Sequence, residues 1–218
     1  MIELLILLIV SYLVGSTPTS IITSRLIYKT DIREHGSGNA GATNVFRTFG
    51  WKPALFVTLV DGFKGWLPAF VAGHFMSENI LFAGNPDLLM ILAGFAAILG
   101  HTYTIFAGFR GGKGVGTAAG MLIALFPIAV PICLAVFILT LMFTGIVSLG
   151  SMLAAITLPL SLYFLGGVVE SSVTLKIFAL LIPLFIIYTH RSNIQRMREG
   201  TENRFKKAMI FSRKRTDA

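Results

Sequence analysis

Residues 130–147 of this chain read VPICLAVFILTLMFTGIV, a stretch with no Asp, Glu, Lys or Arg. A helix needs about 20 mainly apolar residues to cross the hydrocarbon core of a bilayer, so this stretch predicts a transmembrane helix over Val130–Val147. Six further apolar stretches lie on either side of it: Leu4–Tyr28, Pro53–Met76, Leu88–Ala107, Val115–Phe126, Leu149–Leu165 and Val173–Tyr188. The sequence therefore predicts an all-α membrane protein, a bundle of about seven transmembrane helices.

The composition of the whole chain agrees with that prediction. Of its 218 residues, 55% are hydrophobic and only 13% are charged, whereas soluble domains carry about 25% charged residues. A water-soluble globule and a disordered chain are both excluded, because neither tolerates this excess of apolar residues. The single cysteine, Cys133, excludes a disulfide scaffold and a cysteine-rich metal site.

The basic residues predict the orientation of the bundle. Sixteen of the 18 Lys and Arg residues lie near the end of the first span (Arg25), between the first and second spans, between the third and fourth, or after the last. The alternate connections, 77–86, 127–131 and 166–172, hold no Lys or Arg and carry Glu78 and Glu170 instead. Because cytoplasmic connections concentrate basic residues, we expect the N-terminus outside and the C-terminus in the cytoplasm. We also expect one membrane domain over residues 1–203 and a basic, lipid-binding cytoplasmic tail over residues 204–218.

The first inner connection contains EHGSGNAGATNVFRTFG, residues 34–50. Its glycines match the dinucleotide pattern G-x-G-x-x-G, but no strand precedes them, so that interpretation is rejected. Glycines still let backbone N–H groups approach an anion closely, and a helix beginning near Thr43 would add N-terminal N–H groups. Thr43 and Arg47 would then share one helix face. The alternative is a flexible loop followed by a capped helix.

The second inner connection reads GHTYTIFAGFRGGKGVGT, residues 100–117. It is not a nucleotide P-loop, because Ala107 replaces the first glycine of that motif and Gly114 replaces its Ser or Thr. A glycine-rich turn that carries Arg110 and Lys113 next to a helix N-terminus nevertheless suits a phosphate. The alternative is that the two cations only set the topology.

The third inner segment reads YTHRSNIQRMREGTEN, residues 188–203, and places His190 and Asn193 on one face of a helix. A histidine at the end of a span often has a purely structural role, and that alternative stays open.

Two further features lie in or beside the spans. Asp61 and Lys64 are expected to pair, since each alone would cost about 2.5–3.5 kcal/mol at the centre of a membrane helix. Three hydroxyls also lie at one level of an inner turn: Thr144, Ser148 and Ser151.

All three polar clusters fall on the predicted cytoplasmic side, whereas the outer connections are short. This arrangement predicts a membrane-embedded site, open to the cytoplasm, for a substrate that bears phosphate. No carboxylate cluster accompanies the cations, so we expect no metal.

GSGNAGATN, the pair GH and GGKGVGT, and HRSNIQRMREGTE resemble the three motifs of the bacterial acyl-phosphate:glycerol-3-phosphate acyltransferase family. The resemblance runs from the first span to about Asn203, and DGFKG in the second span is similar too. Ala40 stands where the family usually has Pro, and Arg110 where it often has Lys; neither change alters the chemistry. The resemblance implies a seven-span bundle in the bacterial cytoplasmic (inner) membrane, with its active site facing the cytoplasm.

The activity implied is the first acylation of phospholipid synthesis. A fatty acyl group passes from acyl phosphate to the 1-hydroxyl of sn-glycerol 3-phosphate, giving lysophosphatidic acid and phosphate. The implied partners are the bilayer, these two substrates and, in transient contact, a soluble enzyme that forms acyl phosphate. No cofactor and no nucleic acid are expected.

The chemistry and the resemblance together assign roles to the site residues. Arg47 and Lys113 would bring two anions together, Thr43, Ser148 and His190 would hold glycerol 3-phosphate, and Asn193 would donate to the oxyanion. Two bases remain open for the proton of the attacking hydroxyl, a substrate phosphate and His190. The remaining predicted phosphate- and substrate-binding residues are Ser37, Gly38, Asn39, Asn44, Gly111 and Gly112.

Two other functions were weighed against this one. A transporter for a phosphorylated metabolite would share the basic inner site, but it would need an outward path that the outer connections do not suggest. A lipid-phosphate hydrolase would need a His/Asp constellation that the sequence lacks.

Overall fold

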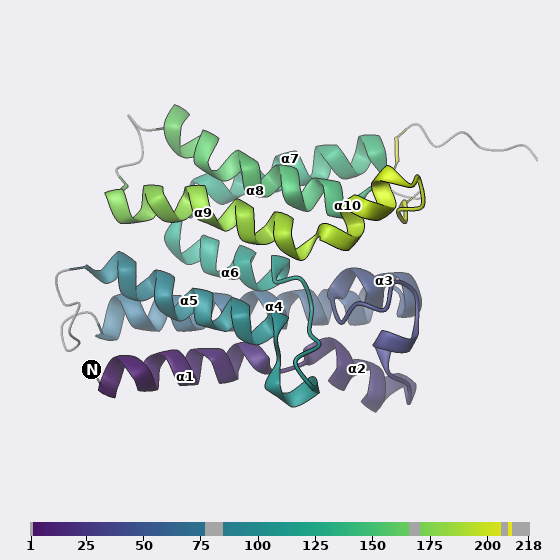
Figure 1. Ribbon diagram of the computed structural model, residues 1–218, viewed down its shortest axis with the longest axis horizontal. Coiled ribbons are helices and arrows are strands. Elements are labelled where there is room, and N and C mark those ends of the chain that lie inside the picture. Colours follow the sequence, from purple (N-terminus) through teal and green to yellow (C-terminus); the bar gives the residue numbers. More distant parts are fainter. Residues whose placement is uncertain (1, 77–84, 166–170, 206–208, 211–218) are drawn as a thin grey trace, which may run out of the picture. The chain divides into compact units, whose positions relative to one another are not determined.

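The computed structural model describes residues 2–76, 85–165, 171–205 and 209–210 (Figure 1). Within these residues the secondary structure is entirely helical, which confirms the all-α prediction. The chain divides into two compact units, residues 1–127 and 128–218, called here the first and the second unit.

The described residues of the first unit form six α-helices and three short turns of helix. In the first unit α5 packs against α1, α4 and α6 (Figure 1). The closest approach is between α4 and α6, where a methyl group on Gly65 would collide with the carbonyl of Thr117. Small residues at such crossings let membrane helices approach each other closely. The elements are α1 Ile2–Ser16, α2 Thr19–Tyr28, η1 Ile32–Glu34, α3 Ala42–Phe49, α4 Trp51–Val71, η2 Ala72–Met76, α5 Pro86–Thr102, η3 Ile105–Ala107 and α6 Val115–Leu125.

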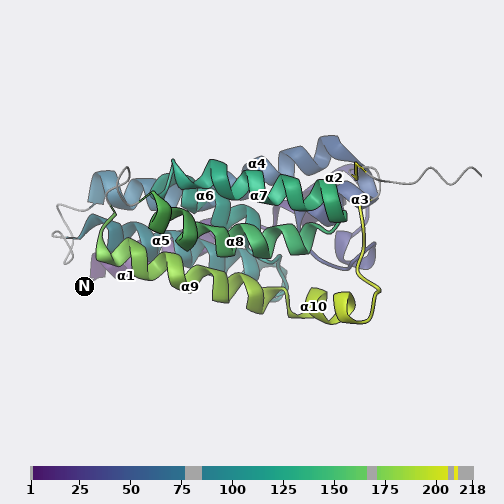
Figure 2. The ribbon, with the colours of Figure 1, turned by 90° about the horizontal axis from the view of Figure 1, so that it is seen from above.

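The second unit holds α7 Ala129–Thr144, α8 Val147–Phe164, α9 Val173–Thr189 and α10 Arg191–Arg198. Within this unit α8 lies between α7 and α9 (Figure 2). The chain reverses between α7 and α8 at Gly145, whose φ of 70° is readily adopted only by glycine. It then bends by 60° between α9 and α10, at His190.

The apolar helices match the predicted spans in position but not all of them in length. Among the described residues, four segments are long and apolar enough to cross a membrane, and a fifth qualifies if α9 and α10 form one bent span. The spans expected at 115–126 and 130–147 are the shorter apolar helices α6 and α7. Seven crossings therefore remain a prediction. Most of the connections 77–86 and 166–172, with Glu78 and Glu170, and most of the tail 204–218 lie outside the described residues.

The first predicted span, Leu4–Tyr28, is not one continuous helix. It breaks at Thr17 and Pro18, because proline lacks an N–H and cannot continue the ladder of hydrogen bonds. The carbonyl oxygens at the break accept hydrogen bonds from α4 and from the residues just after α5. Lys64 Nζ donates to Thr17 O over 2.9 Å, and the hydroxyl of Thr104 donates to Ser16 O. The backbone carbonyls at the break are therefore hydrogen-bonded inside the protein rather than exposed to lipid.

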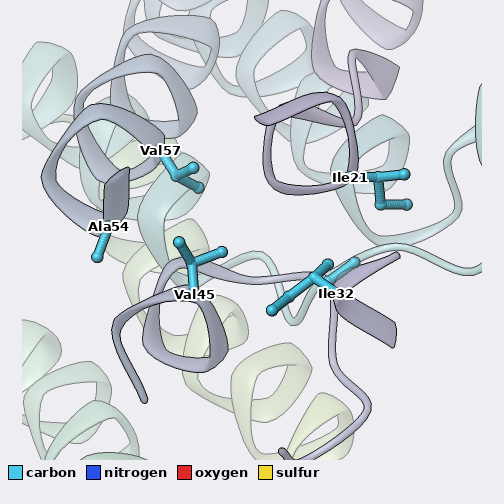
Figure 3. Close-up of a cluster of buried hydrophobic side chains, with 6 residues drawn as sticks. Ile21, Ile32, Val45, Ala54 and Val57 are labelled. Carbon is cyan, nitrogen blue, oxygen red and sulfur yellow. The ribbon is translucent and has the colours of Figure 1, made fainter. Parts of the chain in front are cut away.

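A hydrophobic cluster fixes the first inner connection against the helices (Figure 3). Ile32 and Val45, from η1 and α3, are fully buried, and each such side chain contributes about 1.5–3 kcal/mol of burial free energy. The connection is thus anchored at both ends, which argues against the alternative of a flexible loop. The cluster consists of Ile21, Ile32, Ala40, Val45, Ala54 and Val57.

Candidate functional site

The GSGN turn of the first inner connection is built around Asn44. This side chain lies in the first turn of α3 and is 1% exposed. Its Oδ1 accepts from the N–H of Ser37 (2.9 Å), and its Nδ2 donates to the carbonyls of Ile32 (3.0 Å) and His35 (2.8 Å). These bonds close the turn. We predicted that Asn44 binds substrate; in this structure its contacts are with the loop backbone, and a direct substrate contact stays a prediction.

Ion pairs and hydrogen bonds of Asp31 and Arg33 link the start of the first inner connection to the second one. Asp31 accepts two hydrogen bonds from the Arg33 guanidinium (2.8 and 3.1 Å) and one from Arg25 (2.7 Å). The side-chain hydrogen bonds from Arg33 hold the pKa of Asp31 well below its usual range, against the effect of burial. Arg33 also donates to the carbonyl of Ala107 over 3.0 Å. Through this arginine the two glycine-rich connections of the first unit are joined.

The GGK turn of the second inner connection sits on the C-terminal end of α5. The N–H of Gly111 donates to Thr102 O and that of Gly112 donates to His101 O, both over 3.1 Å. Gly112 and Ala40 of the first connection line one small cavity of the first unit. We predicted that Gly111 and Gly112 are substrate-binding residues, a role in which their backbone N–H groups would face the ligand. Those of Gly111 and Gly112 are instead used to dock the turn, so substrate contact by these two glycines stays a prediction.

The other predicted residues of the first unit lie on this joined pair of connections. Ser37, Asn39, Thr43 and Arg47 are half-buried on the first connection and α3, and Lys113 is half-buried just before α6. Gly38, at φ 71°, is exposed. The Oδ1 atom of Asn39 is buried without a hydrogen-bond partner among the described residues. A buried acceptor of this kind is the feature that a ligand donor would satisfy.

The second unit carries a polar group organised by Glu202, a residue that our sequence analysis did not single out. Its Oε1 accepts from Ser148 Oγ (2.8 Å) and Asn193 Nδ2 (2.7 Å), and its Oε2 accepts from Arg196 Nε (2.8 Å). Burial opposes ionisation, but the hydrogen bonds from Asn193, Ser148 and Arg196 outweigh it and hold the pKa of Glu202 below its ordinary value. One carboxylate thus brings together two predicted site residues from α8 and α10.

His190 lies at the bend between α9 and α10 and is 3% exposed. Its Nδ1 is 2.7 Å from the carbonyl oxygen of Ile186, so Nδ1 carries the hydrogen and donates it. In the neutral ring Nε2 then holds the lone pair. The ring is therefore oriented by a backbone carbonyl of its own helix.

The inner-turn hydroxyls divide into two kinds. Thr144 donates to Thr140 O (2.7 Å) and Ser151 to Val147 O (3.0 Å), which are bonds within their own helices. Ser148 instead donates to a side chain of another segment, the carboxylate of Glu202. The expected ion pair in α4 is confirmed, because Lys64 Nζ lies 2.8 Å from Asp61 Oδ1.

Replacing Glu202 with glutamine should destabilise the protein. The amide retains one acceptor but turns an NH₂ group toward another donor, and hydrogen bonds to a charged group are worth about 1.5–3 kcal/mol. The ionised carboxylate stabilises the fold above its unfolded pKa, near 4.5, and this contribution is lost as the pH falls through the lower folded pKa. We therefore expect a lower unfolding temperature at pH 7 and less further loss on acidification than in the wild type, measured by thermal unfolding in detergent. Glu199→Gln, an exposed neighbour, is the control; equal stability of both variants would contradict the role of Glu202.

Comparison with known proteins agrees with the motifs. A family model described as glycerol-3-phosphate acyltransferase matches residues 5–200. A relative described by the same words in Chlorobaculum parvum is 46% identical, over 94% of this chain and 97% of its own length. The corresponding protein of Chlorobaculum tepidum is 44% identical, over 98% of this chain and 100% of its own.

The fold also matches solved structures. A crystal structure described as PlsY (YgiH), an integral membrane glycerol 3-phosphate acyltransferase in its glycerol 3-phosphate form, superposes with a TM-score of 0.81 at 36% identity. The alignment covers 93% of this chain and 96% of that one. Its lysophosphatidic acid form gives a TM-score of 0.79 at 35% identity.

Proposed function

Because the chain belongs to the glycerol-3-phosphate acyltransferase family, we propose that it transfers a fatty acyl group from acyl phosphate to the 1-hydroxyl of sn-glycerol 3-phosphate. The products are lysophosphatidic acid and phosphate. The observation that carries the proposal is the match along nearly the whole chain to relatives and structures described as glycerol-3-phosphate acyltransferases, one of them in a glycerol 3-phosphate form. A transporter is not favoured, since nothing in these matches points to one.

The choice of acyl phosphate as donor rests on the resemblance of the three motifs to the family that uses it, and the cations of the candidate site suit such a donor. An acyl phosphate is a mixed anhydride and is already activated, so the enzyme needs no covalent acyl intermediate. The reaction must instead bring two anions together, and Arg47 and Lys113 are the cations that we assign to that task. Ser37 and Asn39, on the turn closed by Asn44, are assigned to one phosphate.

The reaction forms one bond and breaks one. The 1-hydroxyl oxygen of glycerol 3-phosphate attacks the acyl carbon, and the acyl carbon–oxygen bond to phosphate breaks as phosphate leaves. Thr43, Ser148 and His190 hold glycerol 3-phosphate in this scheme. Asn193, whose amide group is oriented by its hydrogen bond to Glu202, is assigned as the donor to the oxyanion that forms on the acyl carbon.

The direct test supplies the purified protein with palmitoyl phosphate and glycerol 3-phosphate, without coenzyme A or ATP. We expect lysophosphatidic acid to form, and we expect none when palmitoyl-coenzyme A replaces palmitoyl phosphate. Turnover with palmitoyl-coenzyme A but not with palmitoyl phosphate would refute acyl phosphate as the donor, while glycerol 3-phosphate would remain the acceptor. No turnover with either donor, from folded protein, would refute the proposed function.

The proton of the attacking hydroxyl goes to a substrate phosphate in this proposal. The Nδ1 hydrogen of His190 is donated to the neutral carbonyl of Ile186, whereas the Nδ1 hydrogen of a triad histidine is donated to a carboxylate. His190→Gln should therefore raise the KM for glycerol 3-phosphate by about tenfold, through loss of a buried hydrogen bond, and change kcat less. The limb of the pH–rate profile near 6 should persist, because it belongs to the substrate phosphate. Unchanged KM, a much lower kcat and loss of that limb would identify His190 as the base.

The chain is a multi-pass membrane protein, and we propose that it lies in the bacterial inner membrane with its active site facing the cytoplasm. The orientation is supported by the sixteen Lys and Arg residues that lie on the predicted cytoplasmic side. In the cell, a soluble enzyme that forms acyl phosphate would deliver the donor from the same side.

Single cysteines test the orientation, in a Cys133→Ala background. In intact cells, Val173→Cys, at the exposed start of α9, should react with an impermeant thiol reagent. Thr201→Cys, exposed after α10, should react only after the cells are opened. The reverse pattern would overturn both the orientation and the cytoplasmic site.

A further inference from the structure

A cluster of ionisable side chains is buried in the first unit, and the proposed function gives it no role. Asp61 and Lys64 of α4 are each 4% exposed, and His101 of α5 is 7% exposed. Asp61 Oδ1 lies 2.8 Å from Lys64 Nζ and 3.8 Å from His101 Nδ1. Buried ionisable groups within a membrane span are costly and point to a function.

The Asp61–Lys64 pair has a structural use that does not involve the histidine. The Lys64 ammonium donates to Thr17 O at the break between α1 and α2, and Asp61 neutralises its charge. An uncharged side chain in place of His101 would leave this arrangement intact. The position of His101 beside Asp61 therefore needs a separate explanation.

The other side of His101 faces the glycine-rich turn. The carbonyl of His101 accepts the N–H of Gly112 over 3.1 Å. The imidazole packs so closely on Gly112 that a methyl group there would collide with Nε2 and would lie 3.0 Å from the carbonyl oxygen of Ala40. Gly112 is thus held between His101 and the first inner connection, and the next residue is Lys113.

We propose that His101 is a positioning residue for Lys113. The imidazole, whose Nδ1 lies 3.8 Å from Asp61, and the His101 carbonyl fix Gly112. Gly112 in turn sets the point from which the Lys113 side chain leaves the backbone. This inference rests on the proposed function, because it takes the Lys113 ammonium as the group that meets the phosphate. Displacement of a reacting or binding group by about 1 Å can lower the rate by about 10²-fold. A rigid backbone position for Lys113 should therefore have a measurable effect on the rate.

The test uses steric compensation between His101 and Gly112. Gly112→Ala should lower kcat/KM for palmitoyl phosphate by about 50-fold, because the turn must move away from the ring. Gly62→Ala, whose methyl group would meet its nearest neighbour at 3.9 Å, is the matched control. His101→Ala should lose about tenfold, mainly in the KM for palmitoyl phosphate, and His101→Gln should recover part of that loss by refilling the space. The double variant His101→Ala/Gly112→Ala should be several-fold more active than Gly112→Ala alone.

A second measurement separates this inference from the proposed function. Inorganic phosphate should protect Lys113 from an amine-modifying reagent in the wild type, and protection should need more phosphate in His101→Ala. If the wild-type lysine is not protected and the protein makes no lysophosphatidic acid, the proposed function fails. If the wild type behaves as expected but folded His101→Ala shows the same KM and the same protection, the positioning role is refuted. A double variant no better than Gly112→Ala would refute it as well.

Discussion

Lys113→Ala should lower kcat/KM by about 10²-fold or more, with the amount of folded protein unchanged. The ammonium lies on a half-buried turn whose backbone is docked on the end of α5. A charge held in such a partly dehydrated place stabilises phosphate more strongly than a mobile surface charge does. Initial rates with palmitoyl phosphate and glycerol 3-phosphate, compared with the unfolding temperature, measure the effect.

Arg110→Ala is the matched control, because Arg110 lies in the same connection but is exposed. An exposed charge is screened by salt, so this variant should stay within about threefold of the wild type. Lys113→Arg should also be impaired, since the planar guanidinium needs more room than the compact ammonium. Near-full turnover in Lys113→Ala would remove the second inner connection from the site.

Asn193→Ala should lower kcat by about 10²–10³-fold with little change in either KM, which is the loss expected when one oxyanion donor is removed. The amide is well placed for that task because Glu202 accepts one of its hydrogens and so fixes the orientation of the group. Ser192→Ala, at the exposed neighbouring position of α10, is the control and should be near wild type.

A structural role of Asn193 would give a different result. The lost bond to Glu202 should itself cost about 1.5–3 kcal/mol, visible in thermal unfolding. Asn193→Asp sharpens the distinction, because it keeps the size of the side chain but turns a carboxylate oxygen toward Glu202. A variant that is destabilised yet retains its kcat would show that Asn193 organises the site without meeting the oxyanion.

The helices of this fold are well predicted by hydropathy alone. The span expected at Val115–Phe126 is α6, Val115–Leu125, and the one expected at Val173–Tyr188 is α9, Val173–Thr189. The break in the first span was missed. Thr17 and Pro18 lie inside an apolar run, and the donors that make the break tolerable come from Lys64 and Thr104, far along the chain.

The sequence assigned the candidate site to segments of the chain, but it could not predict the contacts inside those segments. The motifs marked the connections that carry the candidate residues, but glycine spacing could not distinguish an N–H that meets a ligand from one that docks on α5, as in Gly111 and Gly112. Glu202 was missed for a similar reason. It lies 54 positions from Ser148, and only the folded chain brings the two together. Its one sequence signal was its place at the end of the third motif.

The break at Thr17 also bears on the order in which the membrane protein can mature. Residues 2–28 are synthesised before the segments that carry the ammonium and hydroxyl that satisfy the carbonyls of Ser16 and Thr17. Until α4, α5 and the residues just after α5 are in place, those carbonyls depend on water or on the translocation machinery. Residues 2–28 therefore reach their final hydrogen bonding only after these later segments have been inserted. Truncation before Lys64 would leave an N-terminal anchor with an open, hydrated kink.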